Sequence, residues 1–228
     1  MIFAESICKS YQAGSTKTMV LNNVSLSVDR GEFLFLVGPS GSGKSTLLSI
    51  LGCVLAADSG SLEMLGQDVT RLPKAALTRF RRDHLGFVFQ RFHLFRGLTA
   101  MENVRVPLDL QGVDKTLGGR RAKEMLAAVG LSEKVGSDIG RLSMGQRQRV
   151  AVARALIDEP DIVFADEPTA SLDADSGRVT VELMRALAKE RQTTVVVVTH
   201  DARILGYADR VLHLENGKLK PASTEQAH

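Results

Sequence analysis

The sequence has no tryptophan, only two cysteines and no long hydrophobic run. Two cysteines are too few for a disulfide-rich or metal-binding framework, so we expect Cys8 and Cys53 to be small buried side chains in a reducing compartment. The longest uninterrupted apolar stretches have about five residues, whereas a membrane-spanning helix needs about 20. The N-terminal segment MIFAESICKSY lacks the basic start and apolar stretch of a secretory signal. These absences predict a cytoplasmic protein that is held at any membrane by a partner.

A strong excess of charge is also missing, since the net charge is +3 and the isoelectric point is near 9.0. This small positive balance favours an anionic ligand or an anionic membrane surface, and it is too small to indicate a nucleic-acid partner. Internal repeats and low-complexity tracts are not evident. The C-terminal segment PASTEQAH is the one tail-like stretch, and we expect it to be frayed.

Apolar strands alternate with helical patterns along the chain. VSLSV (24–28) alternates like a half-exposed antiparallel strand, whereas FLFLV (33–37) is continuous like a buried parallel strand. Further strands are predicted at 85–90, 161–167 and 193–200, with helices between the later ones. This alternation predicts an α/β fold with a mostly parallel sheet and an N-terminal antiparallel β portion.

A change of pattern suggests a helical lobe within this α/β core. Glycines punctuate helical pieces between 91 and 140, and a further helix is predicted from Ser143 to a stop before Pro160. We expect one domain over 1–228, with a core at about 1–90 and 158–228 and a lobe at about 91–157.

The stretch GPSGSGKST follows the buried strand and opens a helix, as a phosphate-binding loop requires. Its glycines let backbone N–H groups face phosphate oxygens, and the helix N-terminus favours an anion. Lys44 is expected to reach the β- and γ-phosphates, and the Ser45 hydroxyl to bind Mg²⁺. The predicted nucleotide-binding residues of the loop are Gly38, Pro39, Ser40, Gly41, Ser42, Gly43, Lys44, Ser45 and Thr46.

Two acids end the strand DIVFADE. In phosphate-loop proteins a strand-terminal acid such as Asp166 holds Mg²⁺, and Glu167 beside it can act as the general base on the attacking water. Without the phosphate loop, an acidic turn would be the simpler interpretation.

The stretch LSMGQRQRVAVARAL (142–156) resembles the LSGGQ signature of ABC transporter ATP-binding subunits and the helix after it. GPSGSGKST, DIVFADEPTASLD and VVVVTHD complete the family's motifs in the family's order, so the resemblance covers nearly the whole chain. It implies the ABC ATPase fold, with a phosphate-loop NTPase core and an inserted helical lobe. It also implies hydrolysis of ATP with Mg²⁺.

The resemblance assigns further roles by position. Tyr11 resembles the aromatic residue that stacks on adenine, although an edge-strand tyrosine remains the alternative. Gln90 resembles the glutamine that contacts Mg²⁺, and His200 resembles the switch histidine that touches the γ-phosphate and orients Glu167. Asp173 resembles the aspartate of the dimer seam. The signature residues that would face the opposite subunit's ATP are Ser143, Met144, Gly145 and Gln146.

Met144 departs from the family pattern, which usually has glycine there. Methionine is strained if the position needs a positive φ, and it is a good helix former if the position only opens the signature helix. Gly145 is retained, so we expect activity.

The resemblance implies partners as well. Two ATPase subunits, as a homodimer or with a paralogue, bind two ATP head to tail. The chain looks like the MacB/LolD branch, and most like its DevA-type members, which pair with a four-helix permease and in some cases a periplasmic adaptor. These proteins export lipids, glycolipids, lipoproteins, peptides or drugs. The chain would then lie at the inner face of the cell membrane.

Phe92, Leu94 and Phe95 follow Gln90 where the family docks the permease's cytoplasmic helix, and core packing is the alternative interpretation.

Two other functions remain open. A soluble ABC-type ATPase acting on DNA or ribosomes would generally carry coiled-coil or zinc insertions or two ATPase domains, which this sequence lacks. An FtsE-like regulator of cell-wall hydrolases is barely separated from a transporter by sequence.

Overall fold

A six-stranded sheet forms the centre of the computed structural model, which describes residues 1–14 and 16–220. Its strand order is β10-β9-β3-β8-β7-β6, and every pairing is parallel except that of β9 with β10. The strands are β3 (Phe33–Val37), β6 (Leu85–Phe89), β7 (Ile162–Asp166), β8 (Thr194–Val198), β9 (Arg210–Glu215) and β10 (Lys218–Leu219). The predicted mostly parallel sheet is therefore confirmed. The tail expected to be frayed lies outside the described residues.

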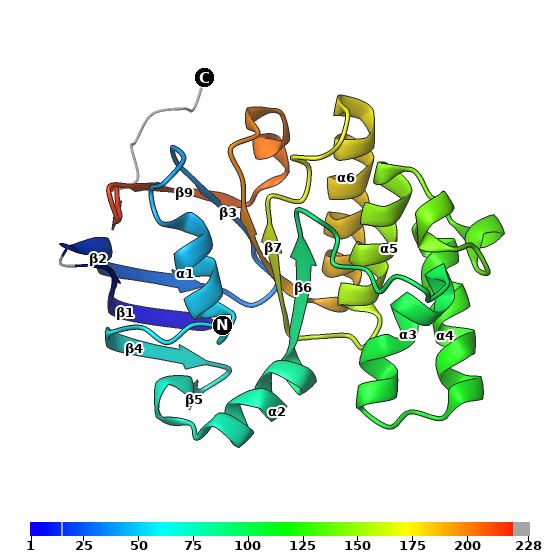
Figure 1. Ribbon diagram of the computed structural model, residues 1–228, viewed down its shortest axis with the longest axis horizontal. Helices are drawn as coiled ribbons and strands as arrows, with labels where there is room; N and C mark the ends of the chain where they lie inside the picture. Colours follow the sequence, from blue (N-terminus) through cyan, green and yellow to red (C-terminus); the bar gives the residue numbers. More distant parts are fainter. Residues whose placement is uncertain (15, 221–228) are drawn as a thin grey trace.

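A second sheet, of order β2-β1-β4-β5, is antiparallel throughout. It contains β1 (Ile2–Ala13), β2 (Thr16–Val28), β4 (Ser59–Met64) and β5 (Gln67–Asp68). Figure 1 shows it beside the central sheet, with α1 (Lys44–Leu51) between the two. This is the N-terminal antiparallel β portion that the sequence predicts.

Alternate side chains of the central strands enter two different cores. The side chains of Phe33, Phe35, Val195 and Val197 pack towards a group of helices on one face. Those of Leu34, Leu36, Val196 and Val198 pack towards α1 and the antiparallel sheet on the other face. Successive residues of a strand point to opposite faces, so a strand covered on both faces must be apolar throughout. This explains the uninterrupted valine run, in which every residue of β8 is buried.

The helices on the first face are α3 (Ala100–Leu110), α4 (Lys115–Ala128), α5 (Met144–Leu156) and α6 (Ala174–Arg191). Figure 1 shows them together on the side of the central sheet opposite α1. No helix in the described ranges combines the length and the apolar character that crossing a membrane requires.

The segment from β4 to α2 (Lys74–His84) is the largest part that the sequence pattern did not predict. Phe80 is the one buried residue of α2, so this helix has too narrow an apolar face to produce a clear helical period. Short 3₁₀ helices complete the chain at Val69–Arg71, Ser132–Lys134, Ile139–Arg141 and Ala202–Tyr207.

Candidate active site

The phosphate loop connects the end of β3 to the start of α1. At Gly38 an added Cβ would lie 2.0 Å from the carbonyl oxygen of Leu214, so any side chain there would collide with β9. Gly43 has φ 102°, a left-handed conformation that favours glycine, directly before the first residue of the helix. Backbone packing and backbone conformation therefore each require glycine in this loop.

Lys44 is buried, and its ammonium lies against the loop. Its Nζ donates hydrogen bonds to the carbonyl oxygens of Gly38 and Pro39 at 2.8 and 2.9 Å. The N-terminus of α1 brings its free N–H groups to the same place, so the loop concentrates positive potential where an anion would bind.

The side chains of Ser45 and Asp166 contact each other at the edge of the central sheet. The Ser45 Oγ donates a hydrogen bond to Asp166 Oδ1 at 3.0 Å. Burial raises the pKa of the Asp166 carboxyl above its usual value, and the Ser45 hydrogen bond opposes this effect.

The side-chain oxygen atoms of Ser45 and Asp166 are suitable ligands for Mg²⁺. In the part of the chain that the structure describes, no three His, Cys, Asp or Glu side chains form a metal-binding group. Mg²⁺ suits such a site, because it binds hard oxygen ligands and is usually held by one or two carboxylates plus water and substrate phosphates.

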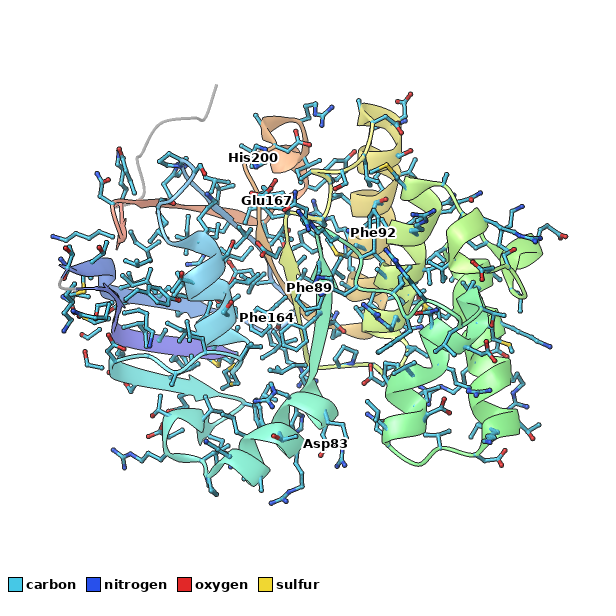
Figure 2. All side chains as sticks on the ribbon, viewed as in Figure 1. Asp83, Phe89, Phe92, Phe164, Glu167 and His200 are labelled. Atoms are coloured by element: carbon cyan, nitrogen blue, oxygen red, sulfur yellow. The ribbon has the colours of Figure 1, made fainter. Side chains whose placement is uncertain are left out.

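Glu167 and His200 form a pair at the ends of β7 and β8, where Figure 2 shows them side by side. His200 Nδ1 lies 2.8 Å from Glu167 Oε1, and the His200 N–H donates to Glu167 Oε2 at 3.3 Å. The Glu167 side chain is 14% exposed, whereas that of His200 is 67% exposed. The carboxylate is thus sheltered while the imidazole reaches towards solvent.

The backbone of Glu167 is held in the left-handed region, with φ 49°. For a residue other than glycine this costs on the order of 1–3 kcal/mol and persists only where the surroundings enforce it. The Glu167 N–H donates to the carbonyl oxygen of Val198 at 2.9 Å, which ties this turn to β8. Such strain is characteristic of functional sites.

A cavity of about 750 Å³ lies beside these groups, and all of them except Asp166 contribute to its lining. Its lining includes Lys44, Ser45, Gln90, Glu167 and His200. The carboxyl ends of β3, β6, β7 and β8 lie at one edge of the sheet because these strands are parallel, and ligands of open α/β sheets bind at this edge. Other members of the lining are Gly38, Pro39, Ser40, Gly41, Gly43, Thr46 and Val20, the last of which no motif had marked.

Tyr11 does not line this cavity. It lies on β1 with 45% of its surface exposed, and the Lys9 Nζ lies 5.9 Å from its ring centroid. Its predicted stacking on adenine stays a prediction.

The signature residues form the N-terminus of α5. Ser143 is the N-cap, its Oγ accepts a hydrogen bond from the Gln146 N–H at 3.2 Å, and Gln146 Oε1 accepts one from the Ser143 N–H at 3.0 Å. Met144 is the first helical residue, is 50% exposed and does not have a positive φ. Of the two possibilities for Met144, the unstrained one holds.

Gly145 has a packing reason within the chain, because an added Cβ would lie 2.9 Å from Ser176 Oγ on α6. Asp173 is the N-cap of the same helix, and its Oδ1 accepts a hydrogen bond from the Ser176 N–H at 2.9 Å. This backbone hydrogen bond holds the pKa of the Asp173 carboxyl below its usual value. The capping role is local, and a role in a dimer seam stays a prediction.

The three predicted docking residues lie in the segment that follows Gln90. Phe95 is 51% exposed and lines a groove, whereas Leu94 packs against the core beneath the helices. Phe92 is half-buried, is not part of the groove lining and has φ 61°. Each of the three residues thus has a different environment.

Arg154 holds this segment in place, a role that no motif had marked. It is buried on α5 and donates hydrogen bonds to the carbonyl oxygens of Phe92 and His93 at 2.9 and 2.6 Å. Both acceptors have positive φ, so a cation from the signature helix fixes a strained turn directly after β6.

The groove has a volume of about 480 Å³ and lies between α2, β6, α3 and the end of α5. Val54, Phe95 and Leu110 line it and are strongly exposed, although they are large and apolar. Arg81, Arg82, Arg154 and Asp158 also contribute to its lining.

Comparison with known proteins identifies a matching family and several relatives of this chain. Residues 21–170 match the family model described as ABC transporter. The lipoprotein-releasing system ATP-binding protein LolD of Shewanella oneidensis is 44% identical over 226 residues, which are 99% of this chain and 98% of the relative. The macrolide export ATP-binding/permease protein MacB of Salmonella typhimurium is 42% identical over 94% of this chain, but the chain spans only 33% of that relative's length.

Two solved structures are also similar to this chain. A dimeric ATP-binding cassette in a post-hydrolysis state, bound to ADP and phosphate, superposes with a TM-score of 0.90 at 38% identity and covers 97% of both chains. A second dimeric structure, of a bacterial ABC transporter cassette, has the same TM-score at 39% identity. The chain belongs to the ABC transporter family and is an ABC-type ATPase.

Proposed function

We propose that this chain is the ATP-hydrolysing subunit of a MacB/LolD-type transporter and that it works as a dimer closed by ATP. The main support is that Lys44, Ser45, Glu167 and His200 line one cavity at one sheet edge, where Asp166 accepts a hydrogen bond from Ser45. Each of these residues suits one task in phosphoryl transfer to water.

In the proposed reaction, Lys44 and the N–H groups of the phosphate loop bind and orient the β- and γ-phosphates. Glu167 accepts the proton of the attacking water, and His200 orients the Glu167 carboxylate through the 2.8 Å contact at Nδ1. Ser45, Asp166 and Gln90 would hold Mg²⁺, which when bound neutralises charge on the phosphates. Tyr11 would contact adenine.

Glu167→Gln tests the general base. The amide keeps the size of the side chain but cannot accept the proton, so kcat should fall by about 10²–10⁴-fold while ATP still binds. The variant should accumulate as an ATP-bound dimer, which light scattering after size-exclusion chromatography would detect. Glu190→Gln, at an exposed position of α6, is the matched control. Wild-type turnover in Glu167→Gln would contradict this role.

The dimer would place Ser143, Met144, Gly145 and Gln146 on the nucleotide held by the opposite subunit. Similarity to two dimeric cassettes supports this arrangement, and Asp173 would lie near the seam. The second subunit is proposed to be a copy of this chain. A heterodimer would appear as a different ATPase subunit in material purified from native membranes.

The groove beside Phe95 is proposed to receive a cytoplasmic helix of the permease. Its exposed Val54, Phe95 and Leu110 support an apolar partner. Phe95→Ala should then weaken recovery of the permease from detergent-solubilised membranes while the free protein keeps its ATPase activity. Leu117→Ala removes an apolar residue of α4 that is 40% exposed, compared with 51% for Phe95, and serves as the control. Equal recovery with both variants would argue against docking in this groove.

The proposed partner is an integral permease with four transmembrane helices, in some systems with a periplasmic adaptor, which would hold this subunit at the inner face of the membrane. Two relatives are named for macrolide export and lipoprotein release, so export of a lipid, glycolipid, lipoprotein, peptide or drug is proposed here. Recovery of wall-hydrolase regulators with the tagged protein would instead support an FtsE-like role. Recovery of a soluble complex alone would contradict both proposals.

A further inference from the structure

Gln148 is a buried amide in the middle of α5 that only half satisfies its hydrogen-bonding groups. Its side chain is fully buried, and its Nε2 donates a hydrogen bond to the carbonyl oxygen of Pro168 at 2.8 Å. Its Oε1 has no hydrogen-bond partner among the described residues. An apolar side chain of the same length would fill this space and remove the unpaired Oε1, but it would leave the buried Pro168 carbonyl without this donor. Packing therefore does not explain the glutamine, and its one hydrogen bond does.

That hydrogen bond reaches the residue directly after Glu167. The proline ring restricts the backbone next to Glu167, whose own φ of 49° is strained. On the other side of the turn, Val198 accepts the Glu167 N–H at 2.9 Å and Asp201 Oδ2 accepts the Thr169 hydroxyl at 3.0 Å. The turn is thus attached to β8 and its following loop on one side and to α5 on the other.

We infer that Gln148 is a positioning residue that holds Glu167 in its strained conformation from the signature helix. Gln148 lies just over one turn after Ser143, the N-cap of α5. In the proposed dimer the start of this helix contacts one ATP while Glu167 of the same chain serves the other ATP. The hydrogen bond to Pro168 then connects the signature at one ATP to the general base at the other. This inference rests on the proposed function.

Gln148→Met tests the hydrogen bond without leaving a cavity. Methionine is unbranched and forms helices well, and it exchanges one unpaired buried oxygen, Gln148 Oε1, for another, the Pro168 carbonyl, so the melting temperature should change little. Loss of the donor to Pro168 should lower kcat by about tenfold or more, because a misplaced catalytic group is costly. The KM for ATP should stay within about twofold, since the phosphate loop is untouched. Gln67→Met, at an exposed position of β5, controls for the chemical change.

Gln148→Glu distinguishes loss of the hydrogen bond to Pro168 from a general structural defect. A protonated carboxyl can donate its O–H to the Pro168 carbonyl, whereas an ionised carboxylate cannot. Burial raises the pKa of such a carboxyl into the accessible range. The ratio of its kcat to that of the wild type should therefore be small at pH 9 and should recover towards one at pH 6.

The inference is overturned if Gln148→Met keeps wild-type kcat, or if it changes KM alone. It is equally overturned if Gln148→Glu is impaired to the same extent at both pH values, and this ratio decides the matter if Gln148→Met fails to fold. A wild-type protein that does not hydrolyse ATP would instead refute the proposed function. Turnover that depends on Glu167 but not on Gln148 would refute this inference alone.

Discussion

Asp158→Asn is expected to stabilise the folded protein above pH 6. Asp158 lies two residues beyond α5 and lines the groove beside Phe95. Burial raises the pKa of its carboxyl from 3.8 to about 6, and Arg121 opposes this effect only in part. Gln111 Nε2 donates a hydrogen bond to Asp158 Oδ2 at 3.3 Å. An asparagine has the same shape, can accept this hydrogen bond and carries no charge.

Proton binding by Asp158 determines how the free energy of unfolding changes with pH. Because the folded-state pKa is raised, the folded protein binds more protons than the unfolded chain between about pH 4 and 6. Stability therefore falls as the pH rises through this window, and the full cost is present above the folded-state pKa. One pKa unit is worth about 1.4 kcal/mol, so the free energy of unfolding loses at most about 3 kcal/mol by pH 7.5.

Urea unfolding at pH 4 and at pH 7.5 measures this effect. Far-ultraviolet circular dichroism is the suitable signal, since the chain has no tryptophan. Asp158→Asn should raise the free energy of unfolding by about 1–3 kcal/mol at pH 7.5 and by much less at pH 4. Asp29→Asn, at an exposed position before β3, is the control. A difference from wild type that is equal at both pH values, or a variant less stable at pH 7.5, would refute the reasoning.

Three further substitutions test the phosphate loop and the signature. Gly38→Ala should lower kcat/KM for ATP by about 100-fold, because its Cβ would displace the loop from Leu214, and unchanged kinetics would contradict this packing. Gly145→Ala should destabilise the fold by about 1–3 kcal/mol in urea by crowding Ser176, and Ser176→Gly should restore part of the loss. Met144→Gly should cost at most about 1 kcal/mol in the same assay. Its ATPase rate should stay within about twofold of wild type, and a rise in the free energy of unfolding would mean that methionine does strain this position.

Local patterns in the sequence determined much of the fold and the chemistry of the site. The phosphate loop, the acids after β7 and the valine strand before His200 were evident because each depends on neighbours along the chain. The valine run predicted a strand buried on both faces, and β8 is covered by helices on one face and by α1 on the other. The helix from Ser143 was predicted from its start and from Pro160, and it spans Met144–Leu156.

Tertiary structure decided what depends on packing between distant segments. The sequence could not give the strand order that brings β8 between β3 and β7, and this order sets the contact between Glu167 and His200. It did not reveal α2 or β4, because their apolar faces are narrow. It could not distinguish Phe95 from its neighbours, since exposure depends on which helices form the groove. The hydrogen bond from Gln148 to Pro168 is likewise invisible in the sequence, because it joins two segments only when α5 packs against the catalytic turn.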